Sequence, residues 1–220
     1  MPDDLNSLKR MAAESAVAQV ASGMTVGLGS GSTAMLVLEA LAARMREGLR
    51  VTGVPSSETT SARARELGIP LIELGETLPL DIAIDGADEV DPALNLIKGR
   101  GGSLLREKIV AQASTRFVVV VDYTKIVHKL GDKPVPVEVA QFGWRATARL
   151  LDQLGAKPER RDKVTDNGNY ILDCVFGPIN APEALARTLD HVTGVAEHGL
   201  FIGMTTEVHV GQTSGVQILR

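Results

Sequence analysis

The sequence predicts an α/β fold, in which a mostly parallel sheet carries helices on both faces and a small α+β subdomain is inserted near the C-terminus. Three observations support this prediction. Short apolar runs alternate with amphipathic segments as far as Asp122. Turns rich in glycine and serine join several of these runs to the segments that follow. Beyond Asp122 the alternation stops, and Pro134 and Pro136 interrupt an apolar stretch, which indicates a second subdomain.

Apolar residues at three- and four-residue steps predict a first helix that begins near Asp3 or Asp4 and ends before Gly23. A buried strand at 24–28, a GSGS turn and a helix at 33–45 then form the first strand-turn-helix unit. Strands that alternate with helices in this way pair in parallel. The same order continues in the predicted strands 51–54, 71–74, 81–85 and 117–121 and in the predicted helices 58–67 and 103–113.

The subdomain is predicted at 131–205, and the main domain at 1–130 and 206–220. A helix at 144–154, a polar turn at 162–169 before a strand, and a helix at 182–189 give the order strand, helix, strand, helix, strand. This order is typical of a small α+β unit. The last apolar segment, 208–219, is predicted to rejoin the main sheet.

The composition excludes several kinds of partner. With 23 basic against 27 acidic residues and only 3% aromatic residues, the chain has neither the positive field nor the stacking platforms that nucleic acid requires. No apolar run approaches the length that spans a membrane, and the acidic N-terminal segment does not fit a signal peptide. The single cysteine, Cys174, lies in an apolar run and is expected to be a buried, inert thiol in a reducing, cytoplasmic protein.

The segment GLGSGSTA at 27–34 joins a strand to a helix through small residues, so backbone N–H groups and the hydroxyls of Ser30, Ser32 and Thr33 can approach a phosphate at the helix N-terminus. A tight turn with a serine cap is an equally good interpretation. The spacing does not fit a P-loop. Gly29, Gly31 and Ala34 fit a dinucleotide fingerprint, but no acidic residue occurs at 48–57 to bind the ribose, which favours a small phosphate ester.

Hydroxyl residues also gather at the next strand-to-helix turn, where they either add donors at the same sheet edge or simply cap the helix: Ser56, Ser57, Thr59 and Thr60. Further along, Asp85 and Asp88 follow a buried strand at the edge where α/β sheets bind ligands. Their carboxylates can hydrogen-bond a polyol, whereas a metal site is disfavoured because no histidine is near. A solvated, Asp-rich turn is the alternative. The four histidines, at 128, 191, 198 and 209, do not have metal-ligand spacing.

Lys98 precedes a glycine-rich turn, and a helix that begins near Ser103 carries Glu107 at the end of its first turn. No basic residue lies three or four positions from Glu107, and its helix face is mostly apolar, so a surface ion pair is disfavoured. A carboxylate in such a place suits a base that accepts a proton from carbon, and a nearby Lys98 would stabilise the negative charge that then develops on oxygen. The alternatives are that Glu107 only interacts favourably with the helix dipole and that Lys98 is a surface lysine.

Several blocks taken together, in order and over nearly the whole chain, resemble the type A ribose 5-phosphate isomerase family. They are GLGSGSTA, SSETT, DGADEVD, KGRGGSLLREK, DYTK at 122–125 and VTDNGNYILD at 164–173. The resemblance implies a Rossmann-like α/β domain with a small, ferredoxin-like α+β domain inserted. It also implies an enzyme that needs no metal or organic cofactor, takes a sugar phosphate as substrate, and forms a homodimer or a dimer of dimers.

Carried over residue by residue, the resemblance makes Glu107 the group that moves a proton between C2 and C1 of the opened sugar through an enediolate. It makes Asp85 a group that opens the ring or holds hydroxyls, Asp88 a partner of substrate oxygens, and Lys98 the partner of the enediolate oxygen. The implied substrate-binding residues are Ser30, Gly31, Ser32, Thr33, Gly86, Ala87, Gly99, Arg100, Gly101 and Lys125.

Two positions depart from the family pattern: Ser30 stands where some members carry threonine, and Arg100 interrupts what is often a run of glycines. Arg100 either needs an unusual backbone angle or turns its side chain outward. Two other functions remain open from the residues. One is a module that senses a sugar phosphate, which is disfavoured because only one helix precedes the first strand. The other is a nicotinamide-dependent dehydrogenase, which is disfavoured by the missing acidic residue.

Overall fold

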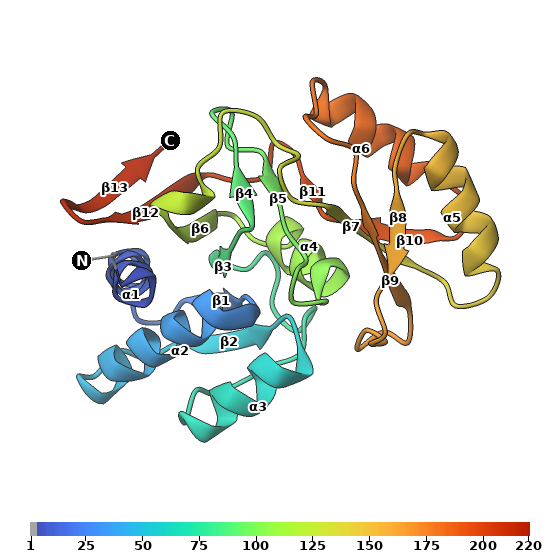
Figure 1. Cartoon of the computed structure of the whole chain (residues 1–220). Helices are drawn as coiled ribbons and strands as arrows, with labels where there is room; N and C mark the ends of the chain where they lie inside the picture. The colour runs from blue at the N-terminus through green and yellow to red at the C-terminus, as the bar shows by residue number, and fades with distance from the viewer. Residues whose placement is uncertain (1–3) are drawn as a thin grey trace. The chain divides into compact units, whose positions relative to one another are not determined.

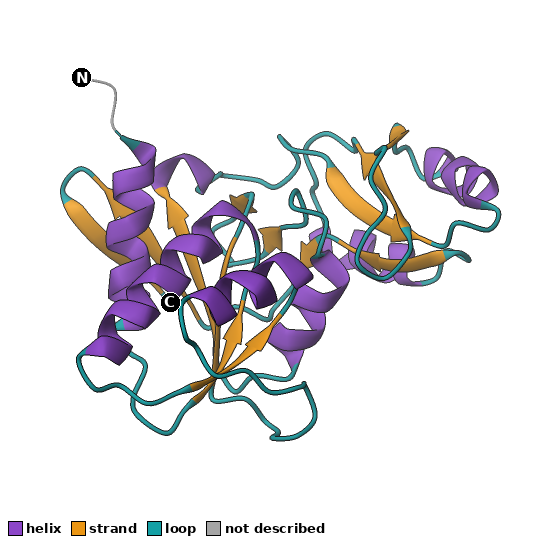
Figure 2. Cartoon of the chain, turned by 90° about the horizontal axis from the view of Figure 1, so that it is seen from below, coloured by secondary structure: helices purple, strands orange, loops and turns teal. Residues whose placement is uncertain are grey.

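The computed structural model describes residues 4–220, which form two compact units. The first unit contains the chain up to Ala87 together with Arg106–Lys125 and Met204–Arg220, and the second contains Asp88–Leu105 and Ile126–Gly203. The second unit also contains residues 88–105, which lie outside the predicted 131–205 subdomain, and within them Leu96 and Ile97 pair with Leu200 and Phe201. Both units combine helices and strands (Figure 2).

A six-stranded sheet forms the centre of the first unit, in the order β13-β12-β6-β3-β1-β2 (Figure 1). Its first five strands along the chain are parallel, and the sixth returns in a hairpin. The prediction of a mostly parallel sheet that the C-terminal segment rejoins is thus confirmed. The strands are β1 (Thr25–Leu28), β2 (Thr52–Pro55), β3 (Ile82–Gly86), β6 (Phe117–Asp122), β12 (Glu207–Gln212) and β13 (Gly215–Leu219).

Helices pack on both faces of this sheet. Val26 and Leu28 of β1 lie in an apolar core with residues of α1 (Leu5–Val17) and α2 (Gly31–Arg46). Gly27, between them, faces the other way, and a Cβ there would lie 2.5 Å from Val110 Cγ1 of α4 (Leu104–Gln112). Only glycine therefore allows α4 to pack this closely, and α4 carries Glu107 toward the carboxyl end of β1.

The other predicted helix of this unit, α3, spans Glu58–Glu66. The first helix begins after its cap Asp4, whose side chain accepts a hydrogen bond from the Asn6 N–H at 3.1 Å. A start at Asp3 lies outside the described residues. The predicted strand 71–74 is wrong, because only Leu71 bridges to Gly53 and the chain then turns.

The second unit contains a four-stranded antiparallel sheet in the order β10-β7-β9-β8. Its chain order, β-α-β-β-α-β, is the ferredoxin-like arrangement. The prediction missed one strand, β8, because the three residues Pro, Glu and Arg give no apolar alternation. The elements are β7 (Val135–Val139), α5 (Trp144–Gln153), β8 (Pro158–Arg160), β9 (Tyr170–Cys174), α6 (Pro182–Asp190) and β10 (Val195–His198).

Three two-residue strands of the second unit form a small extra sheet, in the order β11-β5-β4. They are β4 (Glu89–Val90), β5 (Leu96–Ile97) and β11 (Leu200–Phe201), and a 3₁₀ turn, η1 (Tyr123–Lys125), follows β6 in the first unit. Strands this short leave no periodic pattern, so the sequence did not predict them. None of the helices in the described part of the chain combines the length and the apolar character that a membrane span requires.

Candidate active site

The carboxyl ends of β1 and β3 bring the glycine turn and Asp85 together in the first unit. The Gly29 N–H donates to the Ile84 carbonyl at 3.0 Å, which extends the parallel pairing into the turn. Asp85 is buried, and its Oδ1 accepts hydrogen bonds from the Ser30 N–H at 3.1 Å and from the Gly86 N–H at 2.7 Å. Bonds from two backbone donors stabilise the charged carboxylate in this buried position.

Gly29 makes this arrangement possible because its backbone lies directly against the carboxylate. A Cβ on Gly29 would lie 2.1 Å from Asp85 Oδ1 and 2.2 Å from its Cγ, well inside contact distance. Gly86 packs in a similar way, because a Cβ on Gly86 would lie 3.1 Å from Thr33 Cβ. The two glycines let Asp85 and Thr33 approach the turn.

Ser30 connects the glycine turn to α4. It is the N-cap residue of α2, but its side chain makes no capping hydrogen bond to that helix. Its hydroxyl donates instead to Glu107 Oε1, and Glu107 is buried in the first turn of α4. The structure therefore brings Ser30, Asp85 and Glu107 together, and the sequence did not predict the contact between Ser30 and Glu107.

The start of α2 offers donors to an anion. Gly31 has a positive φ of 80°, and Gly31 and Ser32 are exposed while Thr33 is half-buried. The free N–H groups of a helix N-terminus and its dipole favour negative charge there. Lys125 lies elsewhere in the first unit, half-buried in η1 after β6. Gly86 and Ala87 are the last two residues before the chain passes from the first unit to the second at Asp88.

In the second unit, Lys98 is buried, and its N–H donates to the Gly199 carbonyl at 2.8 Å. Its Nζ lies 5.4 Å from the centroid of the Phe201 ring, close enough for a cation–π interaction. The alternative of a solvated surface lysine is therefore wrong for Lys98, since a buried ammonium needs such partners.

Asp88 and the glycine turn also belong to the second unit. The Asp88 N–H donates to the Ile97 carbonyl at 2.8 Å, and Asp88 Oδ2 accepts from the Arg100 N–H at 3.1 Å. Gly99 and Gly102 take the positive φ values of this turn, 107° and 91°, whereas Arg100 does not have a positive φ and is exposed, as is Gly101. Of the two possibilities for Arg100, the structure thus favours an outward side chain.

Arg161 supports the same turn, a role that the sequence did not predict. Its Nη1 donates to the carbonyl oxygens of Gly99 and Arg100, each at 3.0 Å, and its Nη2 pairs with Asp173 at 2.7 Å. Nothing in the segment around Arg161 distinguishes it from a surface arginine, so no sequence signal could have found this role.

One group of possible metal ligands exists among the described residues of the second unit: Asp190, Glu197 and His198. The His198 Nδ1 accepts from the Leu200 N–H at 3.2 Å, which assigns the ring proton to Nε2. That nitrogen then donates to Asp190 Oδ1 at 3.0 Å. Because Nε2 has no lone pair available in this tautomer, the group fits a structural hydrogen bond and not a metal site.

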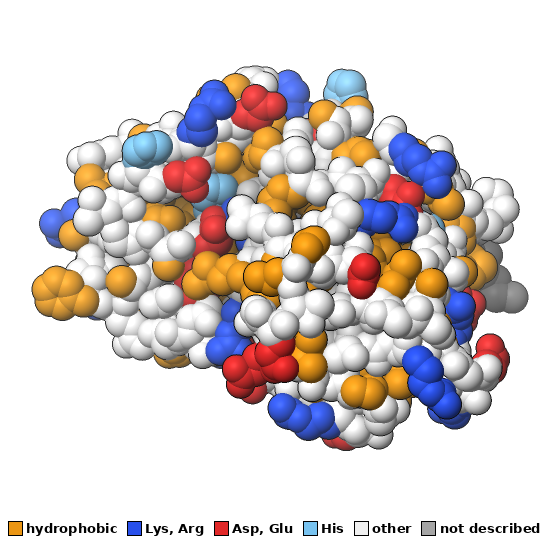
Figure 3. All heavy atoms as spheres, turned by 180° about the vertical axis from the view of Figure 1, so that it is seen from behind, with side chains coloured by type: hydrophobic (Ala, Val, Ile, Leu, Met, Phe, Trp, Pro, Cys, Tyr) orange, Lys and Arg blue, Asp and Glu red, His pale blue; other side chains and the backbone are white. Residues whose placement is uncertain are grey.

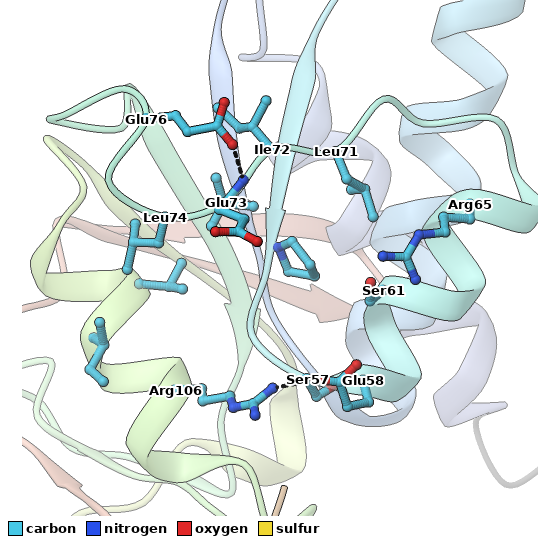
Figure 4. Close-up of a pocket in the computed structure, with 14 residues that line it drawn as sticks. Ser57, Glu58, Ser61, Arg65, Leu71, Ile72, Glu73, Leu74, Glu76 and Arg106 are labelled. Carbon is cyan, nitrogen blue, oxygen red and sulfur yellow. Dashed lines mark hydrogen bonds and ion pairs between the residues drawn. The ribbon is translucent and has the colours of Figure 1, made fainter. Parts of the chain in front are cut away.

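A cavity of about 460 Å³ opens in the first unit between β2, α3, the segment 71–76 and α4 (Figure 4). Val54, Leu71 and Val110 contribute apolar walls, and an ion pair of 2.8 Å between Arg106 and Glu58 lies at its edge. Ser30, Asp85 and Glu107 do not line it. The cavity is therefore separate from the Ser30, Asp85 and Glu107 cluster.

Charged groups on the face shown in Figure 3 are interspersed, with lysine and arginine side chains scattered among acidic and apolar ones. This distribution agrees with the weak overall charge of −4 and offers that face no basic stripe for a polyanion.

Comparison with known proteins gives one consistent result. A family model described as ribose 5-phosphate isomerase A (phosphoriboisomerase A) matches residues 52–215. Proteins named ribose-5-phosphate isomerase A from Gluconobacter oxydans and Gloeobacter violaceus are 53% and 52% identical to the chain. The alignments cover 97% and 98% of this chain and 96% and 97% of those proteins.

Solved structures agree with these relatives. The ribose 5-phosphate isomerase A of Methanocaldococcus jannaschii superposes with a TM-score of 0.93 at 41% identity, over 97% of this chain and 98% of that one. A D-ribose-5-phosphate isomerase in complex with phospho-erythronic acid superposes with a TM-score of 0.97 at 37% identity, over 99% of this chain and 100% of that one.

Proposed function

The chain belongs to the ribose 5-phosphate isomerase A family, and from that premise we propose how its own residues interconvert ribose 5-phosphate and ribulose 5-phosphate. The reaction moves one proton between C2 and C1 of the open-chain sugar. Removing it from the aldose leaves an enediolate, whose negative charge is spread over the oxygens at C1 and C2. Returning the proton to C1, while the hydroxyl proton on the C2 oxygen moves to the C1 oxygen, completes the ketose. The enzyme therefore needs a base and groups that stabilise the oxygen charge.

Glu107 is the base in this proposal, and its hydrogen bond with Ser30 is the observation that carries it. The carboxylate is buried, so water competes little for the proton. The Ser30 hydroxyl orients the carboxylate by holding Oε1, and a base must be held in a defined position to accept a proton from carbon efficiently. A purely structural role of Glu107 in the core would not explain why the Ser30 hydroxyl bonds to Glu107 and leaves α2 without a side-chain cap.

Asp85 has its position fixed by two backbone donors, which suits a group that opens the furanose ring or holds substrate hydroxyls. Asp88 and Lys98 belong to the second unit, and their roles come from the resemblance. According to the resemblance, Asp88 hydrogen-bonds substrate oxygens and Lys98 stabilises the enediolate oxygen. The ammonium of Lys98 is buried beside an aromatic ring, and a desolvated cation interacts more strongly with a developing negative charge.

The phosphate binds at the start of α2 in this proposal, through Gly31, Ser32 and Thr33. The resemblance adds the remaining substrate-binding residues: Gly86, Ala87, Gly99, Arg100, Gly101 and Lys125. Binding energy from the unreactive phosphate holds the sugar against the base, which contributes to the rate of the chemical step.

The ligand of one related structure supports this chemistry. Phospho-erythronic acid, bound to that D-ribose-5-phosphate isomerase, is a sugar acid phosphate. Its planar, negatively charged carboxylate resembles the enediolate, and groups that favour a transition state bind such molecules well. Because a base and a cation supply what the proton transfer needs, we propose that the reaction requires neither a metal nor an organic cofactor.

The protein is further proposed to be a homodimer or a dimer of dimers and to work in the cytoplasm, in the pentose phosphate pathway. The dimer is implied by the family resemblance, and sedimentation equilibrium across a range of concentrations tests it. The location is supported by the single buried cysteine, and cell fractionation tests it.

Kinetics of the purified protein and of the variant Glu107→Gln, both with EDTA present, test the proposed function. The substitution keeps the shape of the side chain but removes its basicity. We expect metal-independent conversion of ribose 5-phosphate by the wild type and a loss of at least roughly a hundredfold in kcat in the variant, with binding retained. A kcat within tenfold of the wild type would exclude Glu107 as the base.

A further inference from the structure

The peptide group between Gly29 and Ser30 is held from both of its sides. Its carbonyl oxygen accepts a hydrogen bond of 2.8 Å from Thr60 Oγ1, and its N–H donates to Asp85 Oδ1 at 3.1 Å. A peptide group is planar, so bonds to its two ends fix its orientation. That orientation sets where the Ser30 Cα lies and where the Ser30 hydroxyl can reach.

Thr60 is itself held firmly. It lies in the first turn of α3 and is fully buried. Its Oγ1 accepts from the Ser57 hydroxyl at 2.8 Å, and its N–H donates to the same Ser57 oxygen at 3.0 Å, which caps α3. Because Thr60 Oγ1 already accepts from Ser57, its single proton is directed to the Gly29 carbonyl. A chain of hydroxyls thus runs from the N-cap of α3 to the glycine turn.

This series of hydrogen bonds ends at the base, since the Ser30 hydroxyl donates to Glu107. We propose that Thr60 is a positioning residue for the isomerisation, because its hydroxyl fixes the Gly29–Ser30 peptide and thereby the hydroxyl that orients Glu107. The inference rests on the proposed role of Glu107. Thr60 bonds to the Gly29–Ser30 peptide, and the Ser30 hydroxyl bonds to Glu107, so Thr60 acts through Ser30.

Replacing Thr60 by valine removes the donor and keeps the side-chain shape. The Gly29 carbonyl then has no hydroxyl partner, and its peptide can rotate and shift the Ser30 hydroxyl. We expect kcat/KM to fall about tenfold, since small displacements of positioning groups slow reactions strongly. Thr60→Ser restores the hydroxyl and should stay within about twofold of the wild type. Thr59→Val is the matched control, the same change at the preceding residue, where the side chain is exposed.

A double-mutant cycle separates positioning from a merely structural role. If Thr60 acts through Ser30, the variant Ser30→Ala/Thr60→Val should be as slow as Ser30→Ala alone, within about twofold, because the hydroxyl to be positioned is already gone. Independent structural damage would instead add a further tenfold loss, and that additivity would overturn the inference. Melting temperatures of all variants verify that the proteins compared are folded.

The remaining outcomes are equally informative. A folded Thr60→Val with wild-type kcat/KM, beside a slow Ser30→Ala, would overturn this inference alone. A Ser30→Ala variant with wild-type kcat/KM would overturn both the inference and the proposed role of the Ser30 and Glu107 pair. If Thr60→Val does not fold, Ser57→Ala makes the test, because it removes the bond that directs the Thr60 hydroxyl. A loss of about threefold is then expected, and no loss would contradict the proposal.

Discussion

The hydroxyl of Ser30 donates its hydrogen bond to Glu107 of α4, although Ser30 is the N-cap residue of α2 and could have capped its own helix. An N-cap serine usually stabilises its helix by about 1 kcal/mol, so the contact with Glu107 replaces a favourable local interaction. The two residues are 77 positions apart, and the contact ties the glycine turn to the base.

The first prediction concerns Ser30. The variant Ser30→Ala should lower kcat/KM at least about tenfold, as loss of a group that orients a catalytic residue commonly does. Ser30→Thr keeps the hydroxyl and should retain most of the activity. A folded Ser30→Ala variant with the kcat/KM of the wild type would contradict the orienting role.

Gly29 gives a second prediction. A methyl group at this position would lie 2.1 Å from Asp85 Oδ1, so Gly29→Ala must displace either the turn or the carboxylate. We expect the isomerase activity to fall by about two orders of magnitude, since shifts of about 1 Å at a site have that effect. Activity assays together with melting curves test this. A folded variant with normal turnover would show that the turn and Asp85 do not need to pack this closely.

The buried carboxylate of Glu207 predicts how stability depends on pH. Burial by itself would raise the pKa of Glu207, but hydrogen bonds from Gln19, His209 and Arg220 and the charge of Arg116 together lower the pKa to about 2. The ordinary value is 4.5. Since the pKa is lower in the folded state, Glu207 stabilises the fold above pH 4.5, and this contribution is lost as the pH falls toward 2.

Urea unfolding of the wild type and of Glu207→Gln at several pH values tests this dependence. The free energy of unfolding should differ most at neutral pH, where the ionised Glu207 is fully effective. The difference should shrink as the pH is lowered from about 4.5, because the carboxylate then becomes protonated in the unfolded wild type and finally in the folded one. A difference that stays constant with pH would rule out a charge effect at Glu207.

Cys174 provides a prediction for the second unit. Burial and the neighbouring charge of Asp173 raise the pKa of the thiol to about 12, and the side chain lies in the apolar core. Because the thiolate is the reactive form, a disulfide reagent at pH 8 should modify the folded protein very slowly and the unfolded protein quickly. Rapid modification of the folded protein would show that the core of this unit opens readily.

Most of the first unit could be predicted from the sequence because its strands are buried and its helices are amphipathic. The patterns failed where they were short or polar. β8 is made of proline, glutamate and arginine, and β4, β5 and β11 have two residues each. The segment 71–74 is apolar enough to suggest a strand, but the Glu73 N–H bonds to the Glu76 side chain at 2.8 Å and the chain turns instead.

Candidate site residues could be named from their chemistry, but their contacts could not. The hydroxyls at 56–60 suggested either a helix cap or ligand donors. The structure confirms the cap for Ser57, whose side chain accepts from the Thr60 N–H. The bond from Thr60 to the Gly29 carbonyl joins residues 31 positions apart. Only the pairing of β1 with β2 brings those two turns together, and no local pattern encodes it.

Exchange of the C2 proton of ribose 5-phosphate in D₂O, followed by NMR for the wild type and for Glu107→Gln, shows directly whether Glu107 removes this proton. If Glu107 is the base, the wild type should exchange this proton and form ribulose 5-phosphate. The variant should bind ribose 5-phosphate, yet exchange its C2 proton at least roughly a hundredfold more slowly than the wild type. Exchange by Glu107→Gln at the wild-type rate would show that another group removes the proton.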